Sequence, residues 1–327
     1  MNKQEIAAAD PLVPQQTDPV QKPKRQKFGM NRRRNIAGTL FAMSPLLGFF
    51  LFSCIPMVLS MYMSFGEMKT FDIFDIEMVG FDNYVFIFTE DPLFFKSILN
   101  SFVYSITTVL LRTIFALLIA MLLRSIPRGS KLISAILFIP FVCSVIATSV
   151  MWKWVFDYNY GVLNDLMDIF GLPRVDWLHE TETAMGVIIV QTVWGNLGFG
   201  IILYTAAFAA INRSYIEAAM IDGANRFRMF FSIEFPMISP TTFYLIVMGF
   251  IGALQSFANF LVMTPNGGPD FSTLTMVYHV YNSAFGYLNF DYGMGYASAL
   301  SWIVGIIVIL FTAANFWLEK KWVNYDV

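Results

Sequence analysis

Residues 213–240, RSYIEAAMIDGANRFRMFFSIEFPMISP, form a polar stretch between two long apolar segments, and this stretch decides the fold. Ser214 and Glu217 have the S-x-x-E spacing of a capping box, which predicts that a helix begins at Tyr215. Gly223 is placed to end this helix, because glycine enters the left-handed conformation of a helix C-terminus without steric cost. The stretch therefore predicts a helix of about two turns outside the apolar segments.

Two features of the same stretch suggest what this short helix does. Ala218 and Ala219 lie in its middle, and side chains this small would let the backbone of another protein approach closely. A second amphipathic stretch, residues 226–235, follows it, and Pro236 and Pro240 are expected to bend the chain before the next apolar segment. The alternative interpretation is a capped connector helix that binds no partner.

The composition indicates a membrane protein. Hydrophobic residues make up 57% of the 327 residues and charged residues 13%, whereas a soluble domain carries about 25% charged residues. Runs of about 20 apolar residues are long enough to span a bilayer. Six such runs occur, at residues 38–63, 98–123, 133–156, 184–207, 243–263 and 297–318. The predicted fold class is an all-α polytopic membrane protein with six transmembrane helices, in which the 213–240 loop joins spans four and five.

The distribution of charge predicts how these spans are oriented. Most of the 21 basic residues lie in the N-terminal tail, the loop after span two, the 213–240 loop and the C-terminal tail. The loops on the opposite side are acidic. Because loops rich in Lys and Arg stay in the cytoplasm, both termini and the 213–240 loop are expected to face the cytoplasm.

The two ends of the predicted membrane domain differ in composition. Residues 1–35 are rich in Pro, Gln and charge, which predicts a disordered cytoplasmic tail, and residues 36–327 are predicted to form one six-span domain. The tail does not resemble a cleaved signal peptide, because the first apolar run is long enough to span the membrane. Cys54 and Cys143 both fall within spans, so no disulfide framework is expected.

Motifs for catalysis and nucleotide binding are missing from the sequence. No G-x-x-x-x-G-K-[ST] segment occurs, so no phosphate-binding loop is expected. His179 and His279 lie in separate predicted external loops and form no metal-ligand cluster. We therefore expect no catalytic residue, metal site or cofactor on this chain. If its work consumes ATP, the ATPase is another polypeptide.

The 213–240 loop resembles the cytoplasmic EAA loop of ABC-importer permeases. The resemblance rests on the order and spacing of Glu217-Ala218-Ala219, Asp222-Gly223-Ala224, Ile233 and Pro236. Four further segments are similar to permeases of the maltose/lactose-type carbohydrate uptake family. They are GFDNY at 80–84, GVLN at 161–164, TPNGGPDFST at 264–273, and Y-x-x-A-F followed by GYASA within 281–299. Each segment is weak evidence alone, but the ordered set is specific. Unlike the maltose permease, this chain has no additional N-terminal spans and no very large second external loop.

The resemblance implies a permease subunit of an ATP-driven importer in a bacterial or archaeal cell membrane. The implied partners are a second, different permease subunit, two ATPase subunits that carry ATP and Mg, an extracytoplasmic solute-binding protein, a carbohydrate substrate and membrane lipid, with no nucleic acid. The resemblance also implies that the short helix couples this chain to an ATPase. The implied coupling residues are Glu217, Ala218, Ala219, Asp222 and Gly223.

Polar side chains within the spans predict the substrate pathway, since such groups tend to face the bundle interior or a cavity. Gly252, Gln255, Ser256 and Asn259 recur at i, i+3, i+4 and i+7, so they are expected to share one face of span five. Amides and hydroxyls offer the donors and acceptors that sugar hydroxyls require. The predicted pathway residues are Gln191, Trp194, Asn196, Phe199, Gln255, Ser256, Asn259, Ser298 and Trp302. The alternative is that these small and polar residues hold transmembrane helices together.

Arg112 is the only basic residue deep within a predicted span. It shares a helix face with Ser101, Tyr104, Ser105 and Thr108 and lies too far from the cytoplasmic end to extend into water. It is therefore expected to point inward. Two roles stay open: an ion pair or gate with a carboxylate of a partner chain, and contact with an anionic substrate.

Three functional hypotheses from different classes follow. The first is a permease subunit of an ATP-driven importer for a sugar or oligosaccharide, with glycerophosphate or another anionic solute as the alternative cargo. The second is an ion-coupled secondary transporter, which would need carboxylates inside the spans, and no Asp or Glu lies well inside any of them. The third is a membrane enzyme, against which the lack of catalytic clusters counts.

Overall fold

The structure is a computed structural model that describes residues 32–68, 76–126, 128–286 and 293–324. Most of the predicted tail, residues 1–31, lies outside the described residues. The chain separates into two units, residues 1–55 and 56–327. The described part of the first unit is helical, with α1 (Arg32–Phe49) followed by the π-helical turn η1 (Phe50–Cys54).

The second unit consists almost entirely of helices. It begins within α2 (Ile55–Met63) and continues with a two-stranded antiparallel sheet, β1 (Gly66–Glu67) with β2 (Glu77–Met78). The helices that follow up to the 213–240 loop are α3 (Asp82–Thr89), α4 (Phe94–Arg124), α5 (Ser130–Val142), α6 (Val145–Val155), α7 (Val162–Ile169) and α8 (Ala184–Ala210). The remaining elements are α9 (Arg213–Ile221), α10 (Arg226–Met229), η2 (Phe230–Glu234), α11 (Phe235–Leu254), α12 (Ala258–Met263), η3 (Pro265–Gly267), η4 (Pro269–Phe271), α13 (Met276–Phe285) and α14 (Gly293–Glu319).

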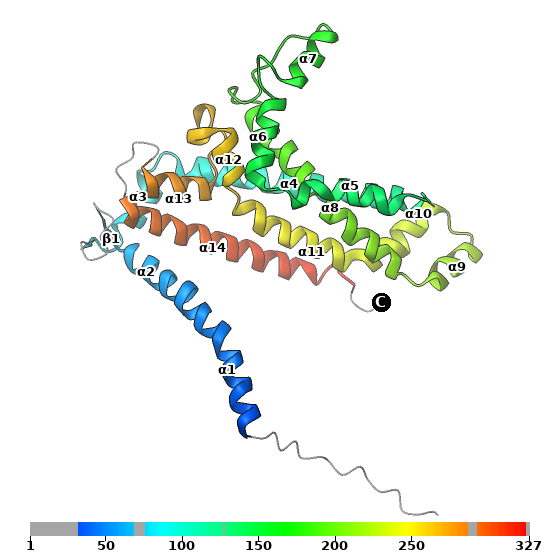
Figure 1. Cartoon of the computed structure of the whole chain (residues 1–327), viewed down its shortest axis with the longest axis horizontal. Coiled ribbons are helices and arrows are strands. Elements are labelled where there is room, and N and C mark those ends of the chain that lie inside the picture. The colour runs from blue at the N-terminus through cyan, green and yellow to red at the C-terminus, as the bar shows by residue number, and fades with distance from the viewer. Residues whose placement is uncertain (1–31, 69–75, 127, 287–292, 325–327) are drawn as a thin grey trace, which may run out of the picture. The chain divides into compact units, whose positions relative to one another are not determined.

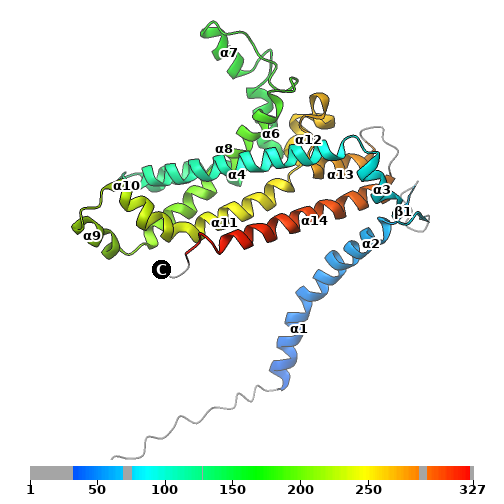
Figure 2. The ribbon, with the colours of Figure 1, turned by 180° about the vertical axis from the view of Figure 1, so that it is seen from behind.

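Helix α4 is central to the second unit. It packs against α8 and α11, while α5 covers α8 and α14 packs against α11 and α13 (Figures 1 and 2). The face of α4 that is buried carries small and polar residues, among them Ser101, Ser105 and Thr108. Small side chains let helices pack closely where the surrounding lipid offers no hydrophobic driving force. Gly198 on α8 shows the same effect, because a Cβ there would collide with the backbone of α5 at Leu137.

Five helical segments are long and apolar enough to cross a membrane: Gly38–Met63, Phe94–Arg124, Ala184–Ala210, Arg226–Leu254 and Gly293–Glu319. A sixth candidate is the pair α5 and α6, which is bent by 98°. The described residues thus hold five spans, or six if this bent pair is counted, as the sequence predicts for an all-α polytopic protein.

Two predicted spans differ from the observed helices. The third, expected as one helix over 133–156, breaks at Cys143 and Ser144, whose backbone is extended. The fifth, expected over 243–263, begins earlier and ends at Leu254, after which three residues separate it from the short helix α12. Hydropathy does not reveal such breaks, because the residues on both sides of each break are equally apolar.

The helix predicted from the capping box is present, but it begins two residues earlier. Asn212 caps α9, since its side-chain oxygen accepts a hydrogen bond from the Ser214 amide at 3.1 Å. Gly223 ends the helix as predicted, with φ +74°. The Ala224 amide donates to the Ala219 carbonyl and the Gly223 amide to the Met220 carbonyl, which is the hydrogen-bond pattern of a Schellman motif.

Pro236 and Pro240 do not interrupt the helix that leads into the fifth span. The chain stays helical from Arg226 to Leu254, with Pro236 in the first turn of α11 and Pro240 inside that helix. The π-helical turn η2 lies directly before Pro236, and turns of this kind accommodate irregular hydrogen bonding without ending a helix. The polar loop is therefore a short helix, a turn and the start of a long helix.

The segments that resemble those of the carbohydrate permeases hold loops of the chain in place. Asn83 donates hydrogen bonds to the carbonyls of Ser64 and Gly66, both at 3.0 Å. Asn164 is buried, and its amide exchanges hydrogen bonds with the backbone of Val175. The hydroxyl of Thr273 joins that of Thr264 at 2.7 Å. These residues hold the extramembrane segments against the helices.

Candidate functional site

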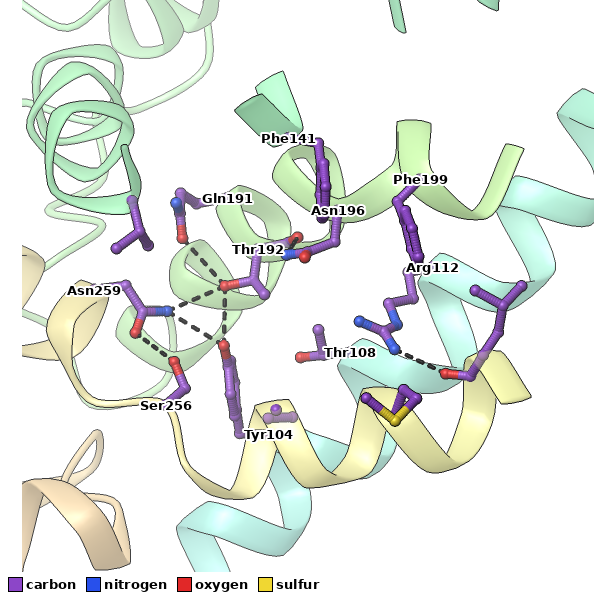
Figure 3. A pocket seen from close by; sticks show the side chains of 15 residues that line it. Tyr104, Thr108, Arg112, Phe141, Gln191, Thr192, Asn196, Phe199, Ser256 and Asn259 are labelled. Carbon is purple, nitrogen blue, oxygen red and sulfur yellow. Dashed lines mark hydrogen bonds between the residues drawn. The ribbon is translucent and has the colours of Figure 1, made fainter. Parts of the chain in front are cut away.

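A cavity of about 330 Å³ lies among α4, α5, α6, α8 and α11 and the break before α12 (Figure 3). It is lined by Tyr104, Thr108, Arg112, Phe141, Val145, Gln191, Thr192, Asn196, Phe199, Leu245, Met248, Gly252, Ala253, Ser256 and Asn259. Both helix breaks open onto this cavity, since Phe141 precedes the first and Ser256 lies within the second. The bends that hydropathy missed therefore help to form the site.

Neutral hydrogen-bonding groups gather at one end of the cavity (Figure 3). The Asn259 amide donates to the Tyr104 hydroxyl at 3.2 Å and to the Thr192 hydroxyl at 3.1 Å. Its oxygen accepts a hydrogen bond from Ser256 at 2.8 Å, and Thr192 donates to Gln191 at 3.1 Å. We call these five residues the amide cluster. Because Asn259 is only 2% exposed, each of its hydrogen bonds orients a neighbour as well as itself.

Two stacked aromatic rings line another part of the cavity. The rings of Phe141 and Phe199 are 5.0 Å apart and nearly parallel, at 14°. Phe141 comes from the last turn of α5 and Phe199 from the middle of α8, so the contact joins the two helices beside the first break. Together with the amide cluster, the rings give the cavity both hydrogen-bonding and apolar surface.

Arg112 supplies the positive charge of the cavity. Its Nη2 donates a hydrogen bond to the Leu245 carbonyl on α11 at 2.9 Å. Within the part of the chain that the structure describes, no carboxylate forms an ion pair with it. Thr108 lies one turn earlier on α4, between Arg112 and the amide cluster (Figure 3), and its buried hydroxyl has no hydrogen-bond partner among these residues.

The structure brings together five of the nine predicted pathway residues, Gln191, Asn196, Phe199, Ser256 and Asn259, and adds Arg112 to them. It does not bring in Gln255. The break after Leu254 ends the helical periodicity on which the shared face of Gln255 and Asn259 depended, and Gln255 instead lines a separate apolar groove with Ser301 and Gly305.

The other three predicted pathway residues also lie outside the cavity. Trp194 packs edge-on against Trp152 of α6, with ring centroids 5.5 Å apart. Ser298 and Trp302 belong to α14, which packs against α11 and α13, whereas α4, α5 and α8 surround the cavity. The Ser301 hydroxyl donates a hydrogen bond to the Ser298 carbonyl within the same helix.

Sequence reasoning missed four important cavity residues. Tyr104 and Thr108 were noted only as neighbours of Arg112, although their i, i+4, i+8 spacing places all three on one stripe of α4. Thr192 is next to Gln191, but consecutive residues of a helix point about 100° apart, so the two were not expected to line one cavity. Phe141 directly follows Pro140, which could have suggested a bend, but its place in the cavity depends on the geometry of that bend.

The coupling residues named from the resemblance lie on α9 and the turn after it, at the end of the second unit away from α13 (Figures 1 and 2). Ala218 is exposed, whereas Ala219 is only 6% exposed. The two alanines nevertheless line one hollow of about 380 Å³, together with Tyr215, Asp222 and Arg228. The most exposed large apolar side chains on this loop are Ile221, 86% exposed, and Phe227, 73% exposed.

An ion pair joins the start of α11 to the end of α4. Arg124 Nη2 lies 2.7 Å from the Glu234 carboxylate, which is buried in η2. The Arg124 guanidinium also lies over the Phe208 ring of α8, 4.5 Å from its centroid. This ion pair connects the 213–240 loop to α4, the helix that carries Tyr104, Thr108 and Arg112.

The two histidines do not form a metal site. Within the described ranges no group of three or more His, Cys, Asp or Glu side chains could hold a metal ion. His279 was expected in an external loop but lies in helix α13, fully buried and 3.6 Å from Asp91. Burial lowers the pKa of His279, and the nearby Asp91 carboxylate opposes this effect.

Comparison with known proteins gives consistent results. Residues 87–324 match the family model described as "Binding-protein-dependent transport system inner membrane component". The chain is 33% identical to the probable ABC transporter permease protein YesP of Bacillus subtilis, over 90% of this chain and 94% of that protein. It is 33% identical to the diacetylchitobiose uptake system permease protein NgcF of Streptomyces coelicolor, over 91% and 86%. It is also 32% identical to the sn-glycerol-3-phosphate transport system permease protein UgpA of Brucella abortus, over 80% and 85%.

A solved structure shares the fold. A chain of a bacterial alginate ABC transporter, in complex with an alginate pentasaccharide-bound periplasmic protein, superposes with a TM-score of 0.76. The match covers 88% of this chain and 96% of that chain at 22% identity. The two chains therefore share their fold over most of their length.

Proposed function

Because the chain belongs to the family of binding-protein-dependent transport system inner membrane components, we propose that it is one permease subunit of an ATP-driven carbohydrate importer. The observation that carries the proposal is the family match over residues 87–324, which includes both the cavity and the 213–240 loop. The three relatives described above are all named as permease proteins of transport or uptake systems. The protein is a multi-pass membrane protein with a transport role.

The chemistry of the cavity supports a carbohydrate as cargo. The amide cluster presents hydroxyl and amide groups that can exchange hydrogen bonds with sugar hydroxyls. The stacked rings of Phe141 and Phe199 offer an apolar surface for the C–H face of a sugar ring. A cavity of about 330 Å³ is within the usual range for small-molecule sites. The relative that takes up diacetylchitobiose agrees with an oligosaccharide.

The proposed assembly contains a second permease, two ATPase subunits that hold ATP and Mg, and an extracytoplasmic solute-binding protein. In this assembly the predicted coupling residues on α9, together with the exposed side chains of Ile221 and Phe227, dock into an ATPase, and both termini face the cytoplasm. ATP-driven movement of α9 is transmitted through the Arg124–Glu234 pair to α4. The cavity then opens alternately to the two sides of the membrane, and the chain breaks no covalent bond.

The proposal is tested by reconstitution of the chain with its candidate partners in proteoliposomes. We expect carbohydrate uptake to require ATP and the solute-binding protein, and to be insensitive to a protonophore or a sodium ionophore. Uptake that persists without ATP and stops when the ion gradient is collapsed would identify a secondary transporter and overturn the proposal.

A further inference from the structure

Arg112 is a cation whose charge no other described residue balances. One N–H donates to the Leu245 carbonyl, and the remaining donors of the guanidinium make no hydrogen bond within the described ranges. Helices α4, α8 and α11, which surround it, contain no Asp or Glu. An arginine near the centre of a span is costly unless a counter-charge or water compensates it.

Helix α11 leaves space for the Arg112 guanidinium. Gly249 on α11 faces it, and a Cβ at this position would collide with Nη2 of Arg112. The Leu245 carbonyl is one turn earlier on the same helix and holds the guanidinium on this side. A glycine and a carbonyl thus form a seat for the charge beside the cavity.

A second unsatisfied donor lies on the same stripe. The Thr108 hydroxyl is buried, lines the cavity and has no partner among the described residues, although a helical threonine can bond to its own helix. Thr108 and Arg112 are one helical turn apart, about 6 Å along the axis. Figure 3 shows both along the cavity, with Thr108 between the amide cluster and Arg112.

We infer that the solute passing through this cavity carries an acidic group, and that Arg112 with Thr108 receives it. The acidic group is a carboxylate or phosphate attached to a sugar or polyol, because a guanidinium fork binds either of these oxyanions. The amide cluster contacts the neutral hydroxyls of the same solute. This inference rests on the proposed function and specifies its substrate class.

The experiment uses the complete assembly in proteoliposomes and matched pairs of radiolabelled probes. One pair is digalacturonate with galactobiose, and the other is glycerol 3-phosphate with glycerol, so that the carboxylate and phosphate sources are separated. The variants are Arg112→Gln, Arg112→Lys and Gly249→Ala. Lys153→Gln is the matched control, because it removes an exposed cation on α6 that does not line the cavity.

We expect the wild-type assembly to take up one acidic probe in preference to its neutral counterpart. Arg112→Gln should raise the KM for that probe at least ten-fold, Arg112→Lys should raise it less, and Lys153→Gln should not change it. Gly249→Ala keeps the charge but displaces the guanidinium from its seat, so it should raise the same KM in a complex that still assembles.

Several results would overturn the inference. ATP-dependent uptake of neutral probes alone would do so while leaving the proposed function intact. If Arg112→Gln fails to assemble, unchanged acidic uptake by Gly249→Ala would show that the charge serves a subunit contact. No ATP-dependent uptake of any probe by the wild-type assembly would instead count against the proposed function itself.

Discussion

Asn259 orients several polar side chains of the cavity at once, because its amide bonds to Tyr104, Thr192 and Ser256. Replacement by leucine would remove three hydrogen bonds, each worth about 0.5–1.5 kcal/mol. We predict that Asn259→Leu lowers carbohydrate transport by at least about ten-fold, since about 1.4 kcal/mol of lost solute binding is a ten-fold change in affinity. Uptake kinetics in proteoliposomes, with co-purification of the ATPases as the assembly check, measure this effect.

Gln255 provides the matched control for Asn259. It is also an amide in the same apolar region, but it faces the groove with Ser301 and Gly305 and does not line the cavity. Gln255→Leu should therefore keep near-normal uptake. If both variants transport normally, or if both prevent assembly, the amide cluster serves helix packing and does not contact the solute.

The contrast between these two residues shows what a single sequence can and cannot predict about a site. Polar residues within apolar runs identified Gln191, Asn196, Ser256 and Asn259, because buried polarity in a membrane is rare and costly. The same reasoning placed Gln255 wrongly, since it assumed an unbroken helix. Side-chain direction after a break depends on the backbone angles of two or three residues, and the composition does not encode them.

At the scale of elements, α9 depends on its C-terminal turn. Gly223 has φ +74° and its amide donates to the Met220 carbonyl, whereas proline has φ near −65° and no amide hydrogen. We predict that Gly223→Pro unfolds the end of α9 and abolishes both ATPase co-purification and uptake, while the chain still reaches the membrane. Pull-down of the ATPase subunits from detergent extracts measures the first effect.

The chain offers a matched control for this variant. Gly171 ends α7 with φ +70° and the same pair of hydrogen bonds, from Gly171 to Asp168 and from Leu172 to Met167. Gly171→Pro should therefore damage a similar turn on the opposite side and leave ATPase co-purification unchanged. Normal coupling in the Gly223→Pro assembly would contradict the docking role of α9.

The contact between η2 and α4 gives a further prediction. The Glu234 carboxylate is buried, while Arg124 is about one-third exposed, so the pair should be stronger than a surface pair but weaker than a fully buried one. A double-mutant cycle of Arg124→Ala and Glu234→Ala should give a coupling energy of about 0.5–3 kcal/mol in the unfolding of the solubilised assembly. The exposed pair of Lys96 and Asp270 is the control, and a coupling no larger than its value would refute the link.

Element types were predicted well from the sequence, and element ends less well. Apolar runs located all the long helices, because a bilayer requires about 20 such residues whatever their order. The capping-box argument found α9 but not its cap, since Asn212 lies before the motif that was considered. The 98° bend between α5 and α6 follows Pro140, a local signal for a break that the apolar-run argument did not use.

At the scale of the whole molecule, the predicted orientation can be tested by labelling. Cys54 and Cys143 are the two cysteines of the chain and can be replaced by serine. Tyr160 before α7 is 87% exposed and Phe227 in the 213–240 loop is 73% exposed. We predict that Tyr160→Cys reacts with a membrane-impermeant maleimide in intact cells, and Phe227→Cys only in inside-out vesicles. The reverse pattern would place the loop on the external side.

Helix α4 links the choice of solute to the coupling with ATP hydrolysis. It is a continuous rod of 31 residues, about 46 Å long, that carries Tyr104, Thr108 and Arg112 in its middle and Arg124 at its last turn. A rigid rod cannot tilt at one end without moving the rest. Substitutions that broaden the cargo range will therefore also alter how much ATP is hydrolysed per molecule imported, and directed evolution of new cargo should recover compensating changes around Glu234.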